Sequence, residues 1–320
     1  MSGTAWQPNM ESGVAARRAK TLQDAHNFFR ERNILSVDTP ALSISTVTDP
    51  NIESITAASA HRPPLYLQTS PEQFMKRLLA AGYPDIYQVC KVFRDGESGS
   101  NHLAEFTMIE WYRLDFGLQE IMQDTIDLLS ALLDQDRVSA APHFISYAEA
   151  FRSTLGLDPY TAEIDVLAKS ANADDDLKDV LGDNRDAWLD LLLAGKVVDA
   201  FADDRLTVLH HYPASQAALA RLCPDDKDFA DRFELFYGSV ELANGYVELT
   251  DADEQLERCK QDQELRGENG LSVPDIDENL IAALRAGLPA CAGVAVGFDR
   301  LFMINEDAID IHASSSFTLD

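Results

Sequence analysis

The sequence predicts an α+β fold built on an antiparallel sheet flanked by helices, with a helical insertion. Apolar and β-branched runs typical of long strands are separated by helical segments, without the regular strand-helix-strand order of a doubly wound sheet. One pair of these runs reverses through a Gly- and Ser-rich turn, which indicates an antiparallel hairpin. With 320 residues and 46% hydrophobic content, the chain can bury one large core.

The first elements follow a start, residues 1–11, that we predict to be disordered. Residues 15–33 carry apolar side chains at helical spacing, and Asn33 is a suitable residue to end that helix. The segment VDTPAL at residues 37–42 is strand-like in composition.

A second helix and a hairpin are expected next. Residues 71–81 predict a helix with a Pro in its first turn, and Ser70 is a natural N-cap. An apolar run at 86–93 is followed by the turn at 95–100 and by aromatic and β-branched residues at 105–113. These residues predict two antiparallel strands.

The second half of the chain begins with an amphipathic helix at 117–134. From about residue 141 to 204 the composition shifts toward Asp and Ala, with short helical periodicities and no motif, which we interpret as a helical insertion. The further expected elements are strands at 206–212 and 233–249, helices at 254–266 and 278–286, a strand running into a helix over 293–303, and a tail at 311–320. Residues 12–310 are therefore expected to form a single domain.

Composition limits the classes of protein to consider. No apolar run approaches the roughly 20 residues that span a bilayer, and the start lacks the features of a secretory signal, so a cytoplasmic location is expected. The four cysteines include no C-x-x-C pair, so neither a disulfide framework nor a zinc site is suggested. His210 and His211 are adjacent on a predicted strand and should face opposite sides, which is poor geometry for joint metal ligation.

The formal net charge is −28, from 54 acidic and 26 basic residues. A surface this negative repels phosphate backbones, so no tRNA or other nucleic acid partner is expected. The charge suits a basic protein partner, but adaptation to a salty cytoplasm gives the same surface with no partner implied. Both explanations stay open.

Two arginines at the ends of predicted strands indicate a nucleotide site. Arg94 ends the first strand of the hairpin, where a guanidinium can clamp a phosphate through two parallel hydrogen bonds. Phe106 on the returning strand offers a flat face for a base, and Arg300 stands where a later strand runs into a helix. Two arginines on separate elements suit the two ends of a triphosphate, although a structural hairpin with a surface Arg explains the first of them equally well.

Several segments resemble the signature motifs of the class II aminoacyl-tRNA synthetases. VDTP at 37–40 is similar to motif 1, FRDGE at 93–97 with EFTMIEWY at 105–112 to motif 2, and GVAVGFDR at 293–300 to motif 3. RFELFYGSVELANGYVELTD at 232–251 resembles the lysyl branch. Within that branch the chain is most similar to the short lysyl-tRNA synthetase paralogues that modify elongation factor P.

The resemblance implies an ATP site with Mg²⁺. Arg94 would hold the α-phosphate and Arg300 the γ-phosphate, and these two are the candidate catalytic residues because positioning and charge neutralisation supply most of such catalysis. Mg²⁺ would be held by Glu234 and Glu241, whose spacing on a continuous strand would need an irregularity near Gly238. The implied ATP-binding residues are Arg94, Glu97, His102, Phe106, Glu241, Leu242, Gly297 and Arg300.

The resemblance also implies a pocket for an amino acid with two amino groups. Glu72 would meet the amino group near the carboxylate, and Glu248 would meet the distant ammonium together with Tyr112 and Asn244. The implied set is Ser70, Glu72, Glu110, Tyr112, Asn244, Glu248 and Ala295. A neutral analogue would leave a buried carboxylate unpaired, so such a pocket discriminates strongly.

The chain departs from the lysyl synthetases within these motifs. Gly96 is added between Asp95 and Glu97, and Leu103 with Ala104 replaces Asn-Pro, which puts the contact to the adenine edge in doubt. Where those enzymes have Gly-x-Gly before the motif 3 Arg, this chain has Ala295-Val296-Gly297. The added methyl is compatible with a β-amino acid substrate and equally with a neutral packing change.

The implied function is that of an ATP-dependent ligase that adenylates (R)-β-lysine or lysine and transfers it to a lysine ε-amino group of elongation factor P. Only about 36 residues precede motif 1, too few for an anticodon-binding barrel. A homodimer is expected, with Pro40 near the two-fold interface. Two alternatives stay open: an adenylate-forming ligase with another acceptor, including tRNA, and a non-catalytic regulator that resembles a synthetase.

Overall fold

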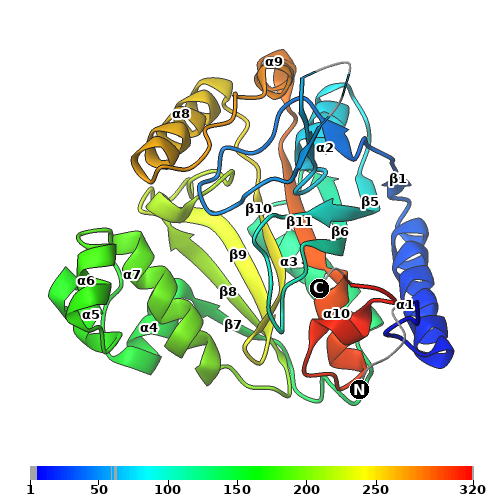
Figure 1. The fold of residues 1–320 in the computed structure, drawn as a ribbon, viewed down its shortest axis with the longest axis horizontal. Helices are drawn as coiled ribbons and strands as arrows, with labels where there is room; N and C mark the ends of the chain where they lie inside the picture. The colour runs from blue at the N-terminus through cyan, green and yellow to red at the C-terminus, as the bar shows by residue number, and fades with distance from the viewer. Residues whose placement is uncertain (1–5, 59, 61–62, 319–320) are drawn as a thin grey trace.

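The computed structural model describes residues 6–58, 60 and 63–318, and it confirms the α+β fold. A sheet of eight strands, in the order β1-β5-β6-β11-β10-β9-β8-β7, runs through the molecule (Figure 1). Its strands are β1 (Leu35–Ser36), β5 (Ile86–Phe93), β6 (Glu105–Leu114), β11 (Cys291–Gly297), β10 (Val240–Val247), β9 (Phe229–Tyr237), β8 (Leu206–Pro213) and β7 (His143–Ser146). From β5 to β8 neighbouring strands are antiparallel, whereas β1 and β7 pair parallel to their neighbours. The predicted antiparallel sheet is therefore mixed at its two edges.

One face of the sheet carries the main hydrophobic core. Successive side chains on a strand point to opposite faces, and Trp111, Val294 and Phe233 from neighbouring strands are buried together on this one. The helices α1 (Ser12–Glu31) and α3 (Leu118–Leu132) pack against them. Just after α1, Asn33 has a φ of 57°, in the left-handed region, which confirms it as the residue where the helix stops.

The segment between β7 and β8 is helical and has a core of its own. It contains α4 (Tyr147–Leu155), α5 (Ile164–Ser170), α6 (Asp175–Leu181), α7 (Arg185–Leu192), η1 (Leu193–Val197) and η2 (Val198–Ala200). Phe151 and Trp188 are buried among these helices and pack with Phe236 of the sheet. Figure 1 shows this lobe, in green, on the side of the molecule away from α1.

The remaining elements complete the fold, and Phe298, Leu301 and Phe302 of the last α-helix join the main core. These elements are β2 (Leu42–Ser43), β4 (Leu65–Leu67) and β3 (Thr56–Ala57), which form a small second sheet, together with α2 (Glu72–Ala80), η3 (Ala214–Gln216), α8 (Ala252–Glu268), α9 (Glu278–Gly287), α10 (Phe298–Asn305) and η4 (Ile311–Ser314). Met75 of α2 and Leu280 of α9 share a cluster with Tyr112 of β6. This packing places α2 beside the polar face of the sheet.

Two of the predicted strands differ from the structure. Residues 37–40 have no regular structure, and only Leu42 of the VDTPAL segment lies in a strand. Pro40 lacks the N–H that a strand interior requires. Residues 233–249 form part of a β9–β10 hairpin, and Gly238 at its turn has a φ of 54°. The irregularity expected near Gly238 is therefore a chain reversal.

The prediction that the His210 and His211 side chains face opposite sides of a strand is wrong. The register between β8 and β9 shifts between His210 and Tyr212, and His211 has a φ of 58°, so the strand bulges there. The bulge breaks the alternation of side chains, and the two Nδ1 atoms lie 2.7 Å apart.

The predicted disordered start, residues 1–11, lies in part outside the described residues. Of the part that is described, Met10 is buried in the main core, and the backbone N–H of Asn9 donates to the carbonyl oxygen of Ser316 at 2.8 Å. The helices of the described chain include none with the length and apolar character needed to cross a membrane.

Candidate active site

The register of four central strands sets the candidate residues in two rows across one face of the sheet. From β6 to β9 the rows are Glu110, Ala295, Asn244 and Glu234, and Tyr112, Gly293, Tyr246 and Arg232. Positions two apart on a strand share a face, and Trp111, between the two rows on β6, points to the opposite face and the main core. The alternation that buries the core therefore collects polar side chains on the other side.

Gly293 lets the side chains of this face approach closely. A β-carbon at this position would lie 2.5 Å from Oε1 of Glu248 and 2.5 Å from Cε1 of Tyr112. Real β-carbons essentially never come so close to other heavy atoms. Glu248 and Tyr112 therefore fill the space that any larger residue at 293 would need.

A buried lysine joins two of the candidate carboxylates. Nζ of Lys76, on α2, lies 2.6 Å from Oε1 of Glu72 and 2.6 Å from Oε2 of Glu248. The side chain of Lys76 is 2% exposed and that of Glu248 is 0% exposed, so this ion pair is removed from water. Burial lowers the pKa of Lys76, but the Glu248 and Glu72 carboxylates outweigh it and raise that pKa above its ordinary value. Lys76 therefore stays charged.

Glu248 and Glu110 are buried carboxyl groups whose surroundings suit a cationic ligand. Oε1 of Glu248 has no hydrogen-bond partner within the described chain, and Tyr112 donates its hydroxyl to Oε1 of Glu110 at 2.8 Å. Burial raises the pKa of Glu248 to about 8. Burial, with the nearby Glu72 carboxylate, also raises the pKa of Glu110. A cationic ligand would offset the lost hydration of both groups.

Four of the predicted nucleotide residues meet at the turn of the β5–β6 hairpin. Nη1 of Arg94 is 3.5 Å from Oε1 of Glu97, and Nε2 of His102 is 3.6 Å from Oε2 of Glu97. The Arg94 guanidinium lies 5.2 Å from the centre of the Phe106 ring. Nε of Arg94 is buried without a hydrogen-bond partner among the residues described. A guanidinium with an unused donor fits an anionic ligand.

Arg300 connects this turn to β10. It lies in the first turn of α10, whose N-cap is Gly297. Nη1 is 3.2 Å from Oε2 of Glu241, and Nε donates to the carbonyl oxygen of Asn101 at 3.0 Å. A cleft of about 350 Å³ opens beside Arg300, and its lining includes His102 and Glu241. Both predicted arginines thus border the same region of the molecule.

The β9–β10 hairpin brings Glu234, on β9, and Glu241, on β10, to this cleft. A register shift between Glu241 and Ala243 turns their side chains relative to a regular ladder. Burial raises the pKa of Glu234 to about 6, and the Glu241 carboxylate adds to the rise, although Arg232 at 2.7 Å opposes it. Two carboxylates beside one cleft provide the oxygen ligands that Mg²⁺ prefers.

Leu242 and Ser70 have surroundings that the sequence did not predict. Leu242 is the extra residue of the bulge in β10, and its side chain is buried in the main core, so only its backbone can face the cleft. Pro71 caps α2 in the place expected for Ser70. The Ser70 hydroxyl still accepts from the backbone N–H of Glu72, at 3.4 Å.

Two charged residues of the site are not among those predicted from the sequence. Lys76 stands four residues after Glu72 in the helix predicted at 71–81, and that spacing alone could have paired them. Asp190, from the helical insertion, lines the cleft and accepts from Nε2 of Gln216 at 2.7 Å. Burial raises the pKa of Asp190 to about 6. No local sequence signal marks Asp190, because its position depends on how the insertion folds over the sheet.

Comparison with known proteins gives one consistent family. A family model described as tRNA synthetases class II (D, K and N) matches residues 6–319. The chain is 43% identical to an elongation factor P–(R)-β-lysine ligase of Pseudoalteromonas translucida, over 95% of this chain and 94% of the relative. Proteins with the same name from Photorhabdus laumondii and Salmonella gallinarum are 43% and 41% identical, covering 95% and 100% of this chain and 94% and 99% of their own.

Proposed function

The chain belongs to the class II tRNA synthetase family (D, K and N), and on that premise we propose that it is an ATP-dependent ligase that adenylates (R)-β-lysine, or lysine, and transfers it to the ε-amino group of a lysine in elongation factor P. The observation that carries the proposal is a site that holds buried carboxylates in one part and two arginines in another. Glu248 belongs to the first part, and Arg94 and Arg300 form the second.

The charge of the carboxylate part suits a diamino acid. Glu72, Glu110 and Glu248 provide up to three negative charges, of which Lys76 neutralises one. The remaining two match the two ammonium groups of β-lysine or lysine, so a monoamino acid would leave a carboxylate without a partner. In this pocket Glu248 with Tyr112 takes the distant ammonium and Glu72 the near one. Ser70, Asn244 and Ala295 complete the proposed pocket.

Adenylation needs position and charge more than a reactive side chain. The carboxylate oxygen of the amino acid attacks the α-phosphorus of ATP in line, and pyrophosphate leaves. In this proposal Arg94 holds the α-phosphate, Arg300 holds the γ-phosphate, and Phe106 stacks on the adenine. In the second step the neutral ε-amine of the acceptor attacks the acyl carbon, AMP leaves with the electron pair of the broken bond, and the amine loses a proton.

Glu234 and Glu241 would hold Mg²⁺. When bound, this ion neutralises phosphate charge and orients the triphosphate. The two carboxylates line the cleft next to Arg300, as a shared role on one triphosphate requires.

We also propose that the protein is a cytoplasmic homodimer and does not act on tRNA. Leu42 and Ile44, close to Pro40, are 45% and 74% exposed, and an apolar strip of this kind favours coverage by a partner subunit. The net charge of −28 opposes the approach of a phosphate backbone.

Mass spectrometry of elongation factor P tests the proposal. The factor is incubated with the protein, ATP and one candidate amino acid at a time. We expect a mass increase of one aminoacyl group, fastest with (R)-β-lysine, none without ATP, and none with the Arg300→Ala variant. No mass increase with any diamino acid would overturn the proposal.

A further inference from the structure

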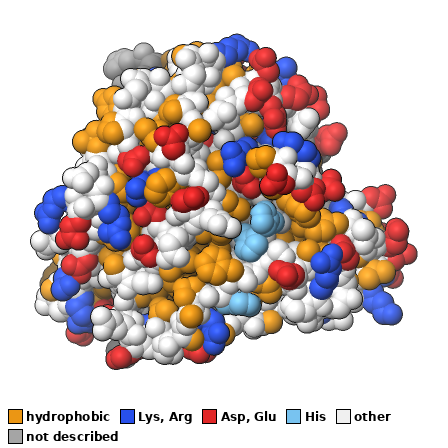
Figure 2. Space-filling model, turned by 180° about the vertical axis from the view of Figure 1, so that it is seen from behind, with side chains coloured by type: hydrophobic (Ala, Val, Ile, Leu, Met, Phe, Trp, Pro, Cys, Tyr) orange, Lys and Arg blue, Asp and Glu red, His pale blue; other side chains and the backbone are white. Residues whose placement is uncertain are grey.

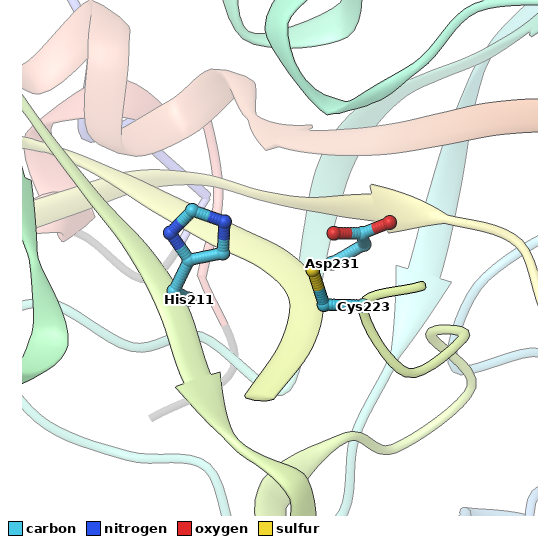
Figure 3. Close-up of side chains that lie close together, drawn as sticks. All are labelled: His211, Cys223 and Asp231. Atoms are coloured by element: carbon cyan, nitrogen blue, oxygen red, sulfur yellow. The ribbon is translucent and has the colours of Figure 1, made fainter. Parts of the chain in front are cut away.

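A second group of ligand-type side chains lies outside the proposed active site. His211 on β8, Cys223 in the loop after η3, and Asp231 on β9 place a ring nitrogen, a thiol sulfur and a carboxylate oxygen within 4.8 Å of one another. Figure 3 shows that the three side chains come from three separate segments and meet between the two strands and the loop. The adenylation chemistry uses none of them.

We propose that His211, Cys223 and Asp231 bind a Zn²⁺ ion. Imidazole nitrogen, thiolate sulfur and carboxylate oxygen are the usual ligands of Zn²⁺, at about 2.0 to 2.3 Å. Ligand atoms on one such ion are roughly 3 to 4 Å apart, so atoms already within 4.8 Å need only small side-chain rotations to bind it. A thiolate with an imidazole favours Zn²⁺ over Mg²⁺, and a water completes the four ligands.

The bulge in β8 directs His211 toward the other two residues. Its φ of 58° is a left-handed conformation that residues with a β-carbon adopt rarely, and it coincides with the register shift between His210 and Tyr212. A bulge of this kind re-aims a side chain that a regular strand would point elsewhere. Such local strain persists where the surrounding structure fixes it, and it clusters at functional sites.

The two ring nitrogens of His211 have separate surroundings. Nδ1 lies 2.7 Å from Nδ1 of His210, so one ring donates to the other. Figure 3 shows the remaining nitrogen of His211 on the side of Cys223 and Asp231. With His211 as the donor to His210, its Nε2 lone pair is free for a metal. Metal-binding histidines commonly donate their second N–H to a neighbour in this manner.

Asp231 and Cys223 are also held in place. Oδ2 of Asp231 accepts from Nε of Arg221 at 2.8 Å, which leaves Oδ1 for an ion, and the side chain is 6% exposed. The backbone N–H of Cys223 donates to the carbonyl oxygen of Phe229 at 2.8 Å. An ion bound here would tie the loop that carries Cys223 to β8 and β9.

Cobalt spectroscopy tests the site, because Co²⁺ occupies zinc sites and a bound thiolate gives it a charge-transfer band in the near ultraviolet. The full chain is stripped with a chelator, returned to excess Mg²⁺ so that the carboxylates of the cleft are occupied, and titrated with Co²⁺. We expect one Co²⁺ per chain, the thiolate band, and its loss when Zn²⁺ is added. The Cys223→Ser variant should lose the band, and His211→Ala should bind at least tenfold more weakly.

Matched controls are available within the chain. The Cys90→Ser and His143→Ala variants remove the same residue types elsewhere and should keep the band. A wild-type spectrum without the band, or a band that persists in Cys223→Ser, would overturn the proposal. Should a variant fail to fold, alkylation of the wild-type chain decides instead: Zn²⁺ should protect Cys223 from iodoacetamide and leave the labelling of Cys90 unchanged. Equal labelling of Cys223 with and without Zn²⁺ would also overturn it.

Discussion

At the scale of single residues, Glu248 is a buried carboxyl group whose charge is incompletely compensated within the described chain. It is fully buried, one of its oxygens has no partner among the described residues, and Lys76 is its nearest counter-charge. A buried carboxylate without full compensation is costly, and an incoming ammonium removes that cost. The selectivity of the proposed pocket therefore rests largely on this position.

The Glu248→Gln variant should lose the diamino acid selectively. Removing the charge that meets the distant ammonium should cost about 3 kcal/mol, roughly a 100-fold fall in kcat/KM for β-lysine, with the KM for ATP nearly unchanged. ATP–pyrophosphate exchange at varied concentrations of each substrate measures both values. The Glu254→Gln variant, at an exposed position, should behave as wild type. Equal losses for both substrates would assign Glu248 to the fold or to a metal instead.

Lys76 should matter for stability more than for catalysis. The Lys76→Met variant removes the cation between two buried carboxylates, so the free energy of unfolding should fall by about 3 kcal/mol. A diamino acid would bring a replacement ammonium, so saturating β-lysine should raise the melting temperature of this variant more than that of wild type. The Lys20→Met variant, which breaks an exposed pair with Asp24 at 2.5 Å, is the control. Equal thermal shifts in the variant and the wild type would contradict the proposed role.

The raised pKa of Glu248 predicts a pH dependence of both folding and binding. Its pKa is about 8 in the folded chain and about 4.3 in an unfolded one, so the folded state holds an extra proton between these values. The contribution of Glu248 to stability is complete below about pH 4.3 and is lost as the pH rises through about 8. An ammonium ligand favours the ionised form, so affinity for β-lysine should rise with pH up to about 8.

Calorimetry measures this linkage directly. At pH 7, binding of β-lysine should release a proton, so the apparent enthalpy should differ between buffers of different ionisation enthalpy. The difference should be smaller in Glu248→Gln. Identical enthalpies in all buffers would show that Glu248 is already ionised in the free protein.

At the scale of elements, the strand alternation that builds the sheet also builds the site. β11 places Gly293 under Glu248 and Tyr112, and Ala295 beside Glu110 and Asn244. The Gly293→Ala variant should therefore lose about 1 to 3 kcal/mol of stability and raise the KM for the amino acid, because its β-carbon displaces both neighbours. Thermal melting and exchange kinetics measure the two effects. Gly267→Ala, with open space at its β-carbon, should be at least as stable as wild type.

The sequence predicted those elements whose ends are marked by nearby residues, such as a turn or a helix cap. The strand predicted at 86–93 coincides with β5, since its apolar run ends at a Gly-rich turn. The run at 233–249 predicts strand structure with an irregularity near Gly238, whereas the chain reverses there, because the turn between β9 and β10 is only two residues long. The bulge at His211 could not be predicted, since it arises from the register of β8 against β9, a non-local property.

The roles of the candidate site residues stay predictions, but the structure shows where these residues lie. Most residues carried over from the family motifs lie on one face of the sheet or around one cleft, because the strands that bear them are neighbours, whereas the Leu242 side chain lies in the main core. Lys76 and Asp190 belong to no motif and were missed. Glu72 lies on the same helix as Lys76, but the second partner, Glu248, is far away in the sequence, so the sequence alone does not show a lysine buried between two carboxylates.

At the scale of the whole molecule, charge bears on the choice of acceptor. The chain has an excess of 28 negative charges, yet basic side chains stand among the acidic ones on the face shown in Figure 2. The effect of this net charge on a large polyanion is a long-range repulsion that salt weakens over a Debye length of about 10 Å at 0.1 M.

The choice of acceptor is tested most directly by offering both acceptors side by side. Labelled β-lysine or lysine is supplied with ATP and the protein, and transfer is measured to elongation factor P and to tRNA under the same conditions. We predict rapid labelling of elongation factor P and negligible labelling of tRNA, at low salt and at 0.1 M alike. Efficient charging of tRNA, at a rate equal to or above that of the protein acceptor, would contradict the proposed function.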